Sequence, residues 1–113
     1  MYTICVSRTF SAAHFIKGSG GRCENTHGHN YRVEVFVAAS RLKAPGMVAD
    51  FTEVGRKLES ILPDHTMLNE HYEFHPTAEN LARHFFDGMA RHFRVTRVRV
   101  WENDYSWAEY GPD

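Results

Sequence analysis

Two histidines separated by one glycine are the part of this sequence best suited to chemistry. His27 and His29 flank Gly28, and Cys23 lies four residues before the first histidine. In an extended strand, residues i and i+2 point to the same face of the sheet. Both imidazoles can therefore reach one metal ion, with the Cys23 thiol nearby as a ligand or a base. The segment predicts a catalytic metal centre.

Catalytic zinc sites commonly use three protein ligands and keep one further position for water or substrate. His27 and His29 supply two of these ligands. We predict His14 as the third, because it ends the preceding strand and that strand is expected to pair alongside. The other candidates for this place are His65, His71, His75 and Cys23.

Asp64 and His65 put a carboxylate beside an imidazole just after a predicted helix. If the fold brings them to Cys23, the three side chains would form a thiol–imidazole–carboxylate relay. An irregular turn with an exposed histidine is the alternative explanation. Glu102 ends a predicted strand, and its carboxylate could accept two hydrogen bonds from a guanidine-like heterocycle or could be a solvated charge.

Two stretches with strand periodicity must position the histidines. Residues 2 to 14 alternate so that apolar side chains share the parity of His14, and residues 29 to 39 repeat the pattern on the parity of His29. A glycine-rich loop, residues 18 to 21, separates the two stretches. The pattern predicts an antiparallel hairpin that brings His14 beside the other two histidines.

Two helical stretches and two short strands follow the hairpin. Asp50 is the predicted N-cap of the first helix, and Pro63 ends that helix. Pro76 opens the second helix, and residues 96 to 101 and 105 to 110 are predicted strands. The order strand–strand–helix–helix–strand–strand predicts an α+β fold with a mostly antiparallel sheet and its helices on one face. Because such a sheet has two open edges, we predict a homo-oligomer whose sheets close a barrel.

Composition limits the classes of function. The 113 residues suit one domain, residues 1–113, and the formal net charge of -1 with scattered basic residues argues against a nucleic-acid partner. No apolar run approaches the roughly 20 residues of a membrane helix, and no signal peptide is recognisable. Two cysteines are too few for a disulfide framework, so we expect a reducing, cytoplasmic setting.

Taken together, these motifs resemble those of the 6-pyruvoyl-tetrahydropterin synthase and 6-carboxy-tetrahydropterin synthase family. The resemblance covers nearly the whole chain, and the blocks occur in the family's order. The matching blocks are Phe10-Ser11-Ala12-Ala13-His14, Cys23 with His27-Gly28-His29, Gly46-Met47-Val48-Ala49-Asp50-Phe51, Asp64-His65 with Leu68-Asn69, Pro76-Thr77-Ala78-Glu79-Asn80, and Glu102.

The resemblance implies a fold, a metal and a substrate. The fold would be the T-fold (tunnelling fold), in which subunits join their sheets into barrels, commonly as hexamers built from two trimers. Zinc would be held by His14, His27 and His29. The substrate would be a small-molecule pterin, 7,8-dihydroneopterin triphosphate.

The resemblance also implies roles for the remaining motif residues. Cys23 matches the family's catalytic base, and Asp64 and His65 match its proton-relay partners. Glu102 matches the glutamate that anchors the pterin ring. The segment that lines the pterin pocket in the family is matched here by Thr77 and Glu79.

Members of the family differ in their product. The spacing from Cys23 to His27 resembles the bacterial branch that forms 6-carboxy-tetrahydropterin for queuosine, and this is our primary prediction. Formation of 6-pyruvoyl-tetrahydropterin is an alternative. Glu24 resembles the glutamate of the folate branch, which yields 6-hydroxymethyl-dihydropterin and uses glutamate as its base.

Two hypotheses come from other classes of protein. A cupin-type metal enzyme would use His27 and His29 with Glu34, but an odd separation from His29 turns Glu34 to the opposite strand face. A non-catalytic barrel subunit would use its zinc for structure, and a fourth protein ligand that closes the site would favour this hypothesis.

Overall fold

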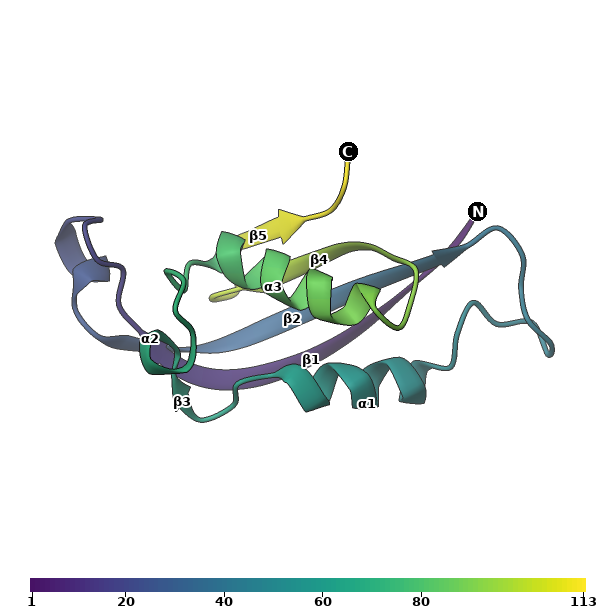
Figure 1. The fold of residues 1–113 in the computed structure, drawn as a ribbon, viewed down its shortest axis with the longest axis horizontal. Coiled ribbons are helices and arrows are strands. Elements are labelled where there is room, and N and C mark those ends of the chain that lie inside the picture. Colours follow the sequence, from purple (N-terminus) through teal and green to yellow (C-terminus); the bar gives the residue numbers. More distant parts are fainter.

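A computed structural model describes residues 1–113 and contains one mixed five-stranded sheet (Figure 1). The strands are β1 (Tyr2–His14), β2 (His27–Ala39), β3 (Thr66–Met67), β4 (Val95–Trp101) and β5 (Trp107–Tyr110). The α-helices are α1 (Phe51–Ile61), α2 (Leu68–His71) and α3 (Ala78–Ala90), and a 3-10 turn, η1 (Gly21–Glu24), lies between β1 and β2. The strands lie in the order β3-β1-β2-β4-β5.

β1 and β2 form the long antiparallel hairpin that the alternation predicts. Each strand has 13 residues and is therefore roughly 40 Å long. The register pairs His14 with His27, and Ala12 with His29. Side chains of directly paired residues lie on the same face of a sheet, so the hairpin carries the three histidines on one face.

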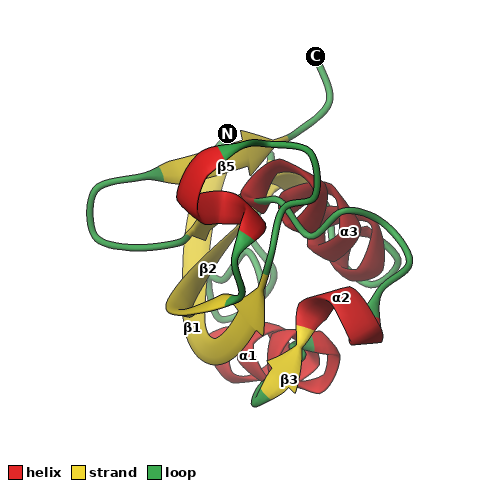
Figure 2. Cartoon of the chain, turned by 90° about the vertical axis from the view of Figure 1, so that its left-hand side faces the viewer, coloured by secondary structure: helices red, strands yellow, loops and turns green.

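The helices cover that same face and enclose the core with it (Figure 2). Tyr31 and Val33 of β2 are fully buried, as are Leu58 of α1 and Phe85 of α3. Phe10 of β1 stacks on Tyr31 with ring centroids 4.7 Å apart. The apolar half of the hairpin thus packs into the core, and its histidine end continues the same surface.

Both long helices begin at the caps that the sequence contains. The Asp50 carboxylate accepts a hydrogen bond from the Thr52 N–H at 2.8 Å, and α1 ends shortly before Pro63. The Thr77 hydroxyl accepts a hydrogen bond from the Asn80 N–H at 3.1 Å and starts α3. The Thr77 cap fixes where α3 begins, and Pro76, the residue before that cap, contacts His14.

The structure confirms the α+β prediction and adds two short elements to it. β3 pairs in parallel with β1 at Ala12 and Ala13, so the sheet is mixed rather than wholly antiparallel. α2 follows β3 directly. Two residues of strand and four of helix are too few to establish a hydrophobic period, so the sequence pattern predicts neither element. The cupin hypothesis is wrong, because two long helices stand where a cupin would continue with strands.

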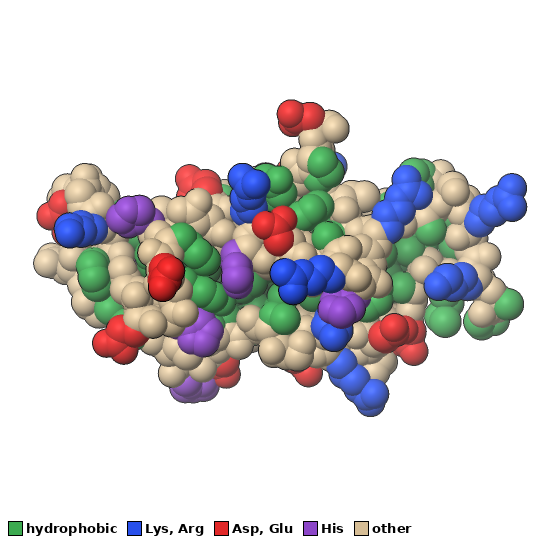
Figure 3. Space-filling view, viewed as in Figure 1, with side chains coloured by type: hydrophobic (Ala, Val, Ile, Leu, Met, Phe, Trp, Pro, Cys, Tyr) green, Lys and Arg blue, Asp and Glu red, His purple; other side chains and the backbone are tan.

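The molecule is elongated, with extents of 51 × 28 × 25 Å. On the face seen in Figure 3, most histidine side chains lie over one half and most lysine and arginine side chains over the other. None of the helices has the length and apolar character needed to cross a membrane.

Candidate metal centre

Three imidazoles meet where the hairpin strands run towards their connecting loop. The Nε2 atoms of His14 and His27 are 3.0 Å apart. The His29 ring centroid lies 5.0 Å from that of His14 and 4.9 Å from that of His27. One ligand atom from each residue lies within 4.8 Å of the other two, so the group could hold a metal ion. The hairpin register alone produces this convergence.

Hydrogen bonds to carbonyl groups set the proton positions of two rings. His14 Nδ1 lies 2.8 Å from the Pro76 carbonyl oxygen, and His27 Nδ1 lies 2.7 Å from that of Asn25. A carbonyl oxygen only accepts, so each Nδ1 carries the proton and donates it. The Tyr31 hydroxyl oxygen is a further 3.2 Å neighbour of His14 Nδ1. Both Nε2 atoms are therefore left as lone-pair donors aimed at the centre of the group.

The donor set fits a divalent transition metal. Because both Nδ1 atoms donate to carbonyl groups, the Nε2 atoms of His14 and His27 direct lone pairs at each other across 3.0 Å, and a cation would relieve that repulsion. Burial lowers the pKa of His29, His14 and His27 lower it further, and the Glu102 carboxylate opposes them. Neutral imidazole is the form that binds metals. His14 itself is buried, with 1% of its surface exposed.

The structure brings together the three histidines predicted as ligands. The other candidates for the third ligand lie outside this group, namely His65, His71, His75 and Cys23.

Glu102 lies against the histidines, although the sequence suggested only a heterocycle as its partner. Its Oε2 atom is 3.1 Å from His29 Nε2 and 3.7 Å from His14 Nε2, and 29% of its side chain is exposed. β4 pairs with β2 at Trp101 and Arg32. Glu102, the residue that follows β4, thus reaches the histidine end of the hairpin. Only the strand register could have shown this in advance.

Cys23 and Glu24 lie in the η1 turn, within the loop that connects the histidine ends of β1 and β2. Cys23 is a free, exposed cysteine, and its carbonyl oxygen accepts a hydrogen bond from the Ile16 N–H at 2.6 Å. The Glu24 carboxylate accepts a hydrogen bond from the Gly20 N–H at 3.0 Å. Gly20 has φ 76, a left-handed conformation that glycine adopts readily. Glu24 thus closes its own loop, while the Cys23 thiol remains free.

Asp64 and His65 lie at the outer edge of β1. The Asp64 carboxylate accepts a hydrogen bond from the Ser11 N–H at 2.8 Å, and the His65 N–H donates to the Ser11 carbonyl at 2.6 Å. His65 Nδ1 lies 2.9 Å from Asp64 Oδ2. The Ser11 N–H bond is the largest cause that lowers the pKa of Asp64, and His65 adds to it. This hydrogen-bonded pair is fixed to the strand edge.

The pair is not joined to Cys23 within one chain. His65 lines a shallow cavity of about 390 Å³ together with Ser11, Asn30 and His29. Ser11 and Asn30 have the parity of the sheet face opposite to the three histidine rings. No hydrogen bond connects the Cys23 thiol to Asp64 or His65. His65 has φ 57, unusual for a residue with a side chain, so the edge position is held at some conformational cost. The predicted relay is therefore not assembled by a single chain.

Thr77 and Glu79 lie at the start of α3. Thr77 is the N-cap of the helix, and Glu79 is exposed in its first turn. Pro76, directly before the cap, supplies the carbonyl that accepts the hydrogen bond from His14 Nδ1. The start of α3 is thereby fixed beside the metal ligands.

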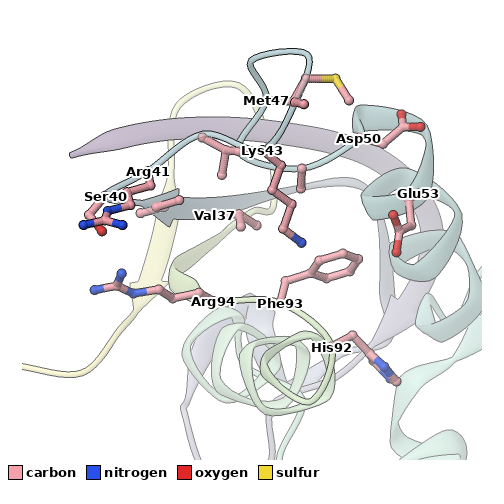
Figure 4. Close-up of a pocket in the computed structure, with 15 residues that line it drawn as sticks. Val37, Ser40, Arg41, Lys43, Met47, Asp50, Glu53, His92, Phe93 and Arg94 are labelled. Atoms are coloured by element: carbon pink, nitrogen blue, oxygen red, sulfur yellow. The ribbon is translucent and has the colours of Figure 1, made fainter.

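A separate cavity of about 510 Å³ lies near the other end of the hairpin and shares no residue with the histidine group. Figure 4 shows Lys43 extending into it, with Phe93 beside Lys43. Its other basic side chains belong to Arg41, His92 and Arg94. Its distance from the histidines separates it from the metal chemistry.

The fold and the three-histidine group define a class of protein: an α+β protein with a candidate metal centre at one end of a sheet hairpin. Comparison with known proteins specifies the family. The sequence profile of the 6-pyruvoyl tetrahydropterin synthase family matches residues 3–113. The chain belongs to this family, which is a family of enzymes acting on pterins.

Individual relatives agree with this assignment. The chain is 43% identical over 109 residues to the putative 6-carboxy-5,6,7,8-tetrahydropterin synthase of Archaeoglobus fulgidus, covering 94% of this chain and 92% of that protein. It is 35% identical over 117 residues to the 6-carboxy-5,6,7,8-tetrahydropterin synthase of Bacillus subtilis, covering 90% and 80%. The structure of the 6-pyruvoyl tetrahydropterin synthase of Caenorhabditis elegans superposes with a TM-score of 0.88 at 25% identity, covering 99% and 96%. The T-fold prediction is confirmed.

Proposed function

We propose that this protein is a zinc-dependent lyase that converts 7,8-dihydroneopterin triphosphate to 6-carboxy-5,6,7,8-tetrahydropterin, releasing acetaldehyde and triphosphate. The observation that carries the proposal is the convergence of His14, His27 and His29 on one face. The names of the two relatives described above support this product. The reaction would serve queuosine biosynthesis, and the two free cysteines support a reducing, cytoplasmic setting.

The three histidines would hold zinc, which supplies Lewis-acid polarisation of substrate oxygen atoms when it is bound. The carbonyl oxygens of Pro76 and Asn25 accept hydrogen bonds from the Nδ1–H groups of His14 and His27 and so keep these two rings oriented. Cys23, as its thiolate, would act as the base that takes up protons from the substrate side chain and returns them. Its exposure and lack of a partner leave it free to do so.

The pterin would bind beside the metal at the ends of β4 and α3. Glu102 would accept hydrogen bonds from the two adjacent N–H groups of the ring, as a carboxylate does with guanidinium. Thr77 and Glu79 would line the same pocket, because the start of α3 is held against His14 by Pro76.

Asp64 and His65 would serve a neighbouring subunit. They are bonded to each other, and no hydrogen bond joins them to Cys23 of their own chain. Most of the outer edge of β1 is open, since β3 covers only Ala12 and Ala13. Exposed apolar side chains near the other end of that edge favour burial against a second copy, namely Tyr2, Leu42, Met47 and Phe51. We therefore propose a homo-oligomer, with a hexamer of two trimers as the expected size.

Two other products remain as alternatives: 6-pyruvoyl-tetrahydropterin, and 6-hydroxymethyl-dihydropterin formed with Glu24 as the base. The hydrogen bond between Glu24 Oε1 and the Gly20 N–H favours Cys23 over Glu24 as the base, because it ties one oxygen of the Glu24 carboxylate to its own loop.

The test is to incubate zinc-loaded protein with 7,8-dihydroneopterin triphosphate and identify the products by mass spectrometry. We expect 6-carboxy-tetrahydropterin together with acetaldehyde. If the substrate is not consumed with zinc present, the enzyme proposal is wrong. Detection of either of the other pterins as the main product would select the corresponding alternative.

A further inference from the structure

The position of Glu102 points to a role that pterin binding alone does not explain. Its carboxylate oxygen Oε2 lies 3.1 Å from His29 Nε2 and 3.7 Å from His14 Nε2. These are the atoms that would bind the metal. A residue reserved for the pterin ring would have no need to approach them.

The backbone of Glu102 is fixed, while its side chain has no other partner. The Glu102 N–H donates to the Ser106 carbonyl at 3.2 Å, and the Asn103 side chain accepts from the Tyr105 and Ser106 N–H groups at 2.8 and 2.9 Å. No N–H or O–H group outside the histidines donates to the Glu102 carboxylate. The turn after β4 therefore holds the carboxylate next to the imidazoles, and only those rings engage it.

The arrangement of the imidazoles and the Glu102 carboxylate favours a cation between them. His14 carries its proton on Nδ1, so its Nε2 lone pair faces the Glu102 carboxylate. His29 Nε2 is buried and lacks a hydrogen bond of acceptable geometry, despite the nearby carboxylate. A carboxylate facing lone pairs is repulsive unless a positive charge lies among them. Three imidazoles and one carboxylate form a donor set typical of zinc.

We propose that Glu102 is a fourth, exchangeable ligand of the metal ion in the substrate-free protein, and that a bound pterin ring draws it away. The exchange rests on the proposed function, whereas the ligand role does not. The guanidine-like edge of a pterin offers the carboxylate two N–H donors, which compete with the metal for the same oxygen atoms. Binding of the ring would thereby open one coordination position only when a substrate is present.

The exchange distinguishes this site from a structural zinc site. A structural site is closed by four permanent protein ligands, whereas a catalytic site keeps one position open. The 29% exposure of the Glu102 side chain leaves it room to move. His14 is 1% exposed and is held by Pro76, so it has no such freedom.

The first experiment measures zinc affinity without substrate, by titrating metal-free protein in the presence of a competing chelator. Glu102→Gln keeps the shape of the side chain and removes its charge, and we expect it to weaken zinc binding by at least about 10-fold. Glu102→Asp keeps the charge on a shorter side chain and should give an intermediate affinity. Glu73→Gln, at an exposed carboxylate far along the chain from any ligand, is the matched control and should bind zinc like the wild type. Equal affinity of the wild type and Glu102→Gln would overturn the ligand role.

The second experiment replaces zinc by cobalt, whose visible absorption reports its ligands, and adds 7,8-dihydroneopterin, which lacks the triphosphate leaving group. We expect the pterin to change the wild-type spectrum, and to change that of Glu102→Gln much less. Calorimetry establishes the saturating pterin concentration for each protein. An unchanged wild-type spectrum at saturation, or absence of pterin binding, would overturn the exchange.

Turnover of dihydroneopterin triphosphate by wild-type protein is measured separately. Failure of turnover counts against the proposed function, and unchanged zinc affinity counts against Glu102 alone.

Discussion

Removing one histidine should remove most of the stabilisation expected from bound zinc, and His27→Ala is the sharpest form of this test. The His27 ring is only partly buried, and its one carbonyl bond, to Asn25, lies within its own loop. Its loss should therefore disturb the metal-free fold less than loss of the buried His14. His65→Ala is the matched control, because the His65 side chain is 83% exposed and lies outside the histidine group.

The expected size of the effect follows from mass action. A metal at about 100 times its dissociation constant stabilises the folded state by about 2.7 kcal/mol. For a domain slightly above 100 residues, that corresponds to a rise in melting temperature of roughly 10 °C. Losing a hydrogen-bonding partner of a ligand weakens metal binding by up to about 100-fold, and we take this value for the loss of one ligand. The remaining stabilisation is then about 0.4 kcal/mol, or a rise in melting temperature of about 2 °C.

The assay is thermal unfolding followed by circular dichroism, with metal-free protein before and after zinc is added. The zinc-induced change is compared rather than the melting temperature itself, so any effect of His27→Ala on the metal-free fold cancels. Protein concentration is held constant because oligomerisation also shifts the transition. We expect the full zinc-induced rise for wild type and His65→Ala. A full rise in His27→Ala, or none in wild type, would refute the three-histidine centre.

Three further predictions concern separate parts of the molecule. Cys23→Ala should abolish product formation in the mass-spectrometric assay, whereas Glu24→Ala should retain it, since the Glu24 carboxylate is bonded to Gly20; the opposite result would favour the folate branch. Asp50→Ala should lower the free energy of unfolding in urea by about 1 kcal/mol, because the N-cap bond to Thr52 is lost; an unchanged midpoint would show that the cap contributes nothing. Asp64 has a lowered pKa in the folded protein, so its carboxylate contributes stability above its unfolded-state pKa and loses it as the pH falls through the folded-state value. The difference in unfolding free energy between wild type and Asp64→Asn should thus shrink on acidification, and a difference independent of pH would contradict this.

Sequence patterns predicted the parts of the fold in which a regular alternation repeats over many residues. Alternation over residues 2 to 14 and 29 to 39 specifies which side chains share a face, so the convergence of His14 with His27 and His29 could be predicted, although the second strand in the structure already begins at His27. Asp50 identified the start of α1 for a similarly local reason, since its side chain caps the helix that follows it.

Other parts depended on relations that no local pattern contains. The proximity of Glu102 to His29 follows from the register between β2 and β4, which are joined only after two helices. The edge position of Asp64 and His65 depends on β3, a strand of only two residues. The proposed contact of this pair with Cys23 would join two chains. No local sequence pattern shows which residues approach each other across a boundary between subunits.

The hydrogen bond from His14 to the Pro76 carbonyl links the orientation of a proposed metal ligand to the packing of helix α3, which supplies no ligand itself. α3 starts directly after Pro76 and is anchored in the core by Leu81, Phe85 and Met89, all fully buried. A substitution that loosens the packing of α3 would allow the Pro76 carbonyl to move away from His14, and we expect it to weaken zinc binding. A laboratory selection for tighter metal retention should accordingly enrich changes in the hydrophobic interior as well as around the imidazoles.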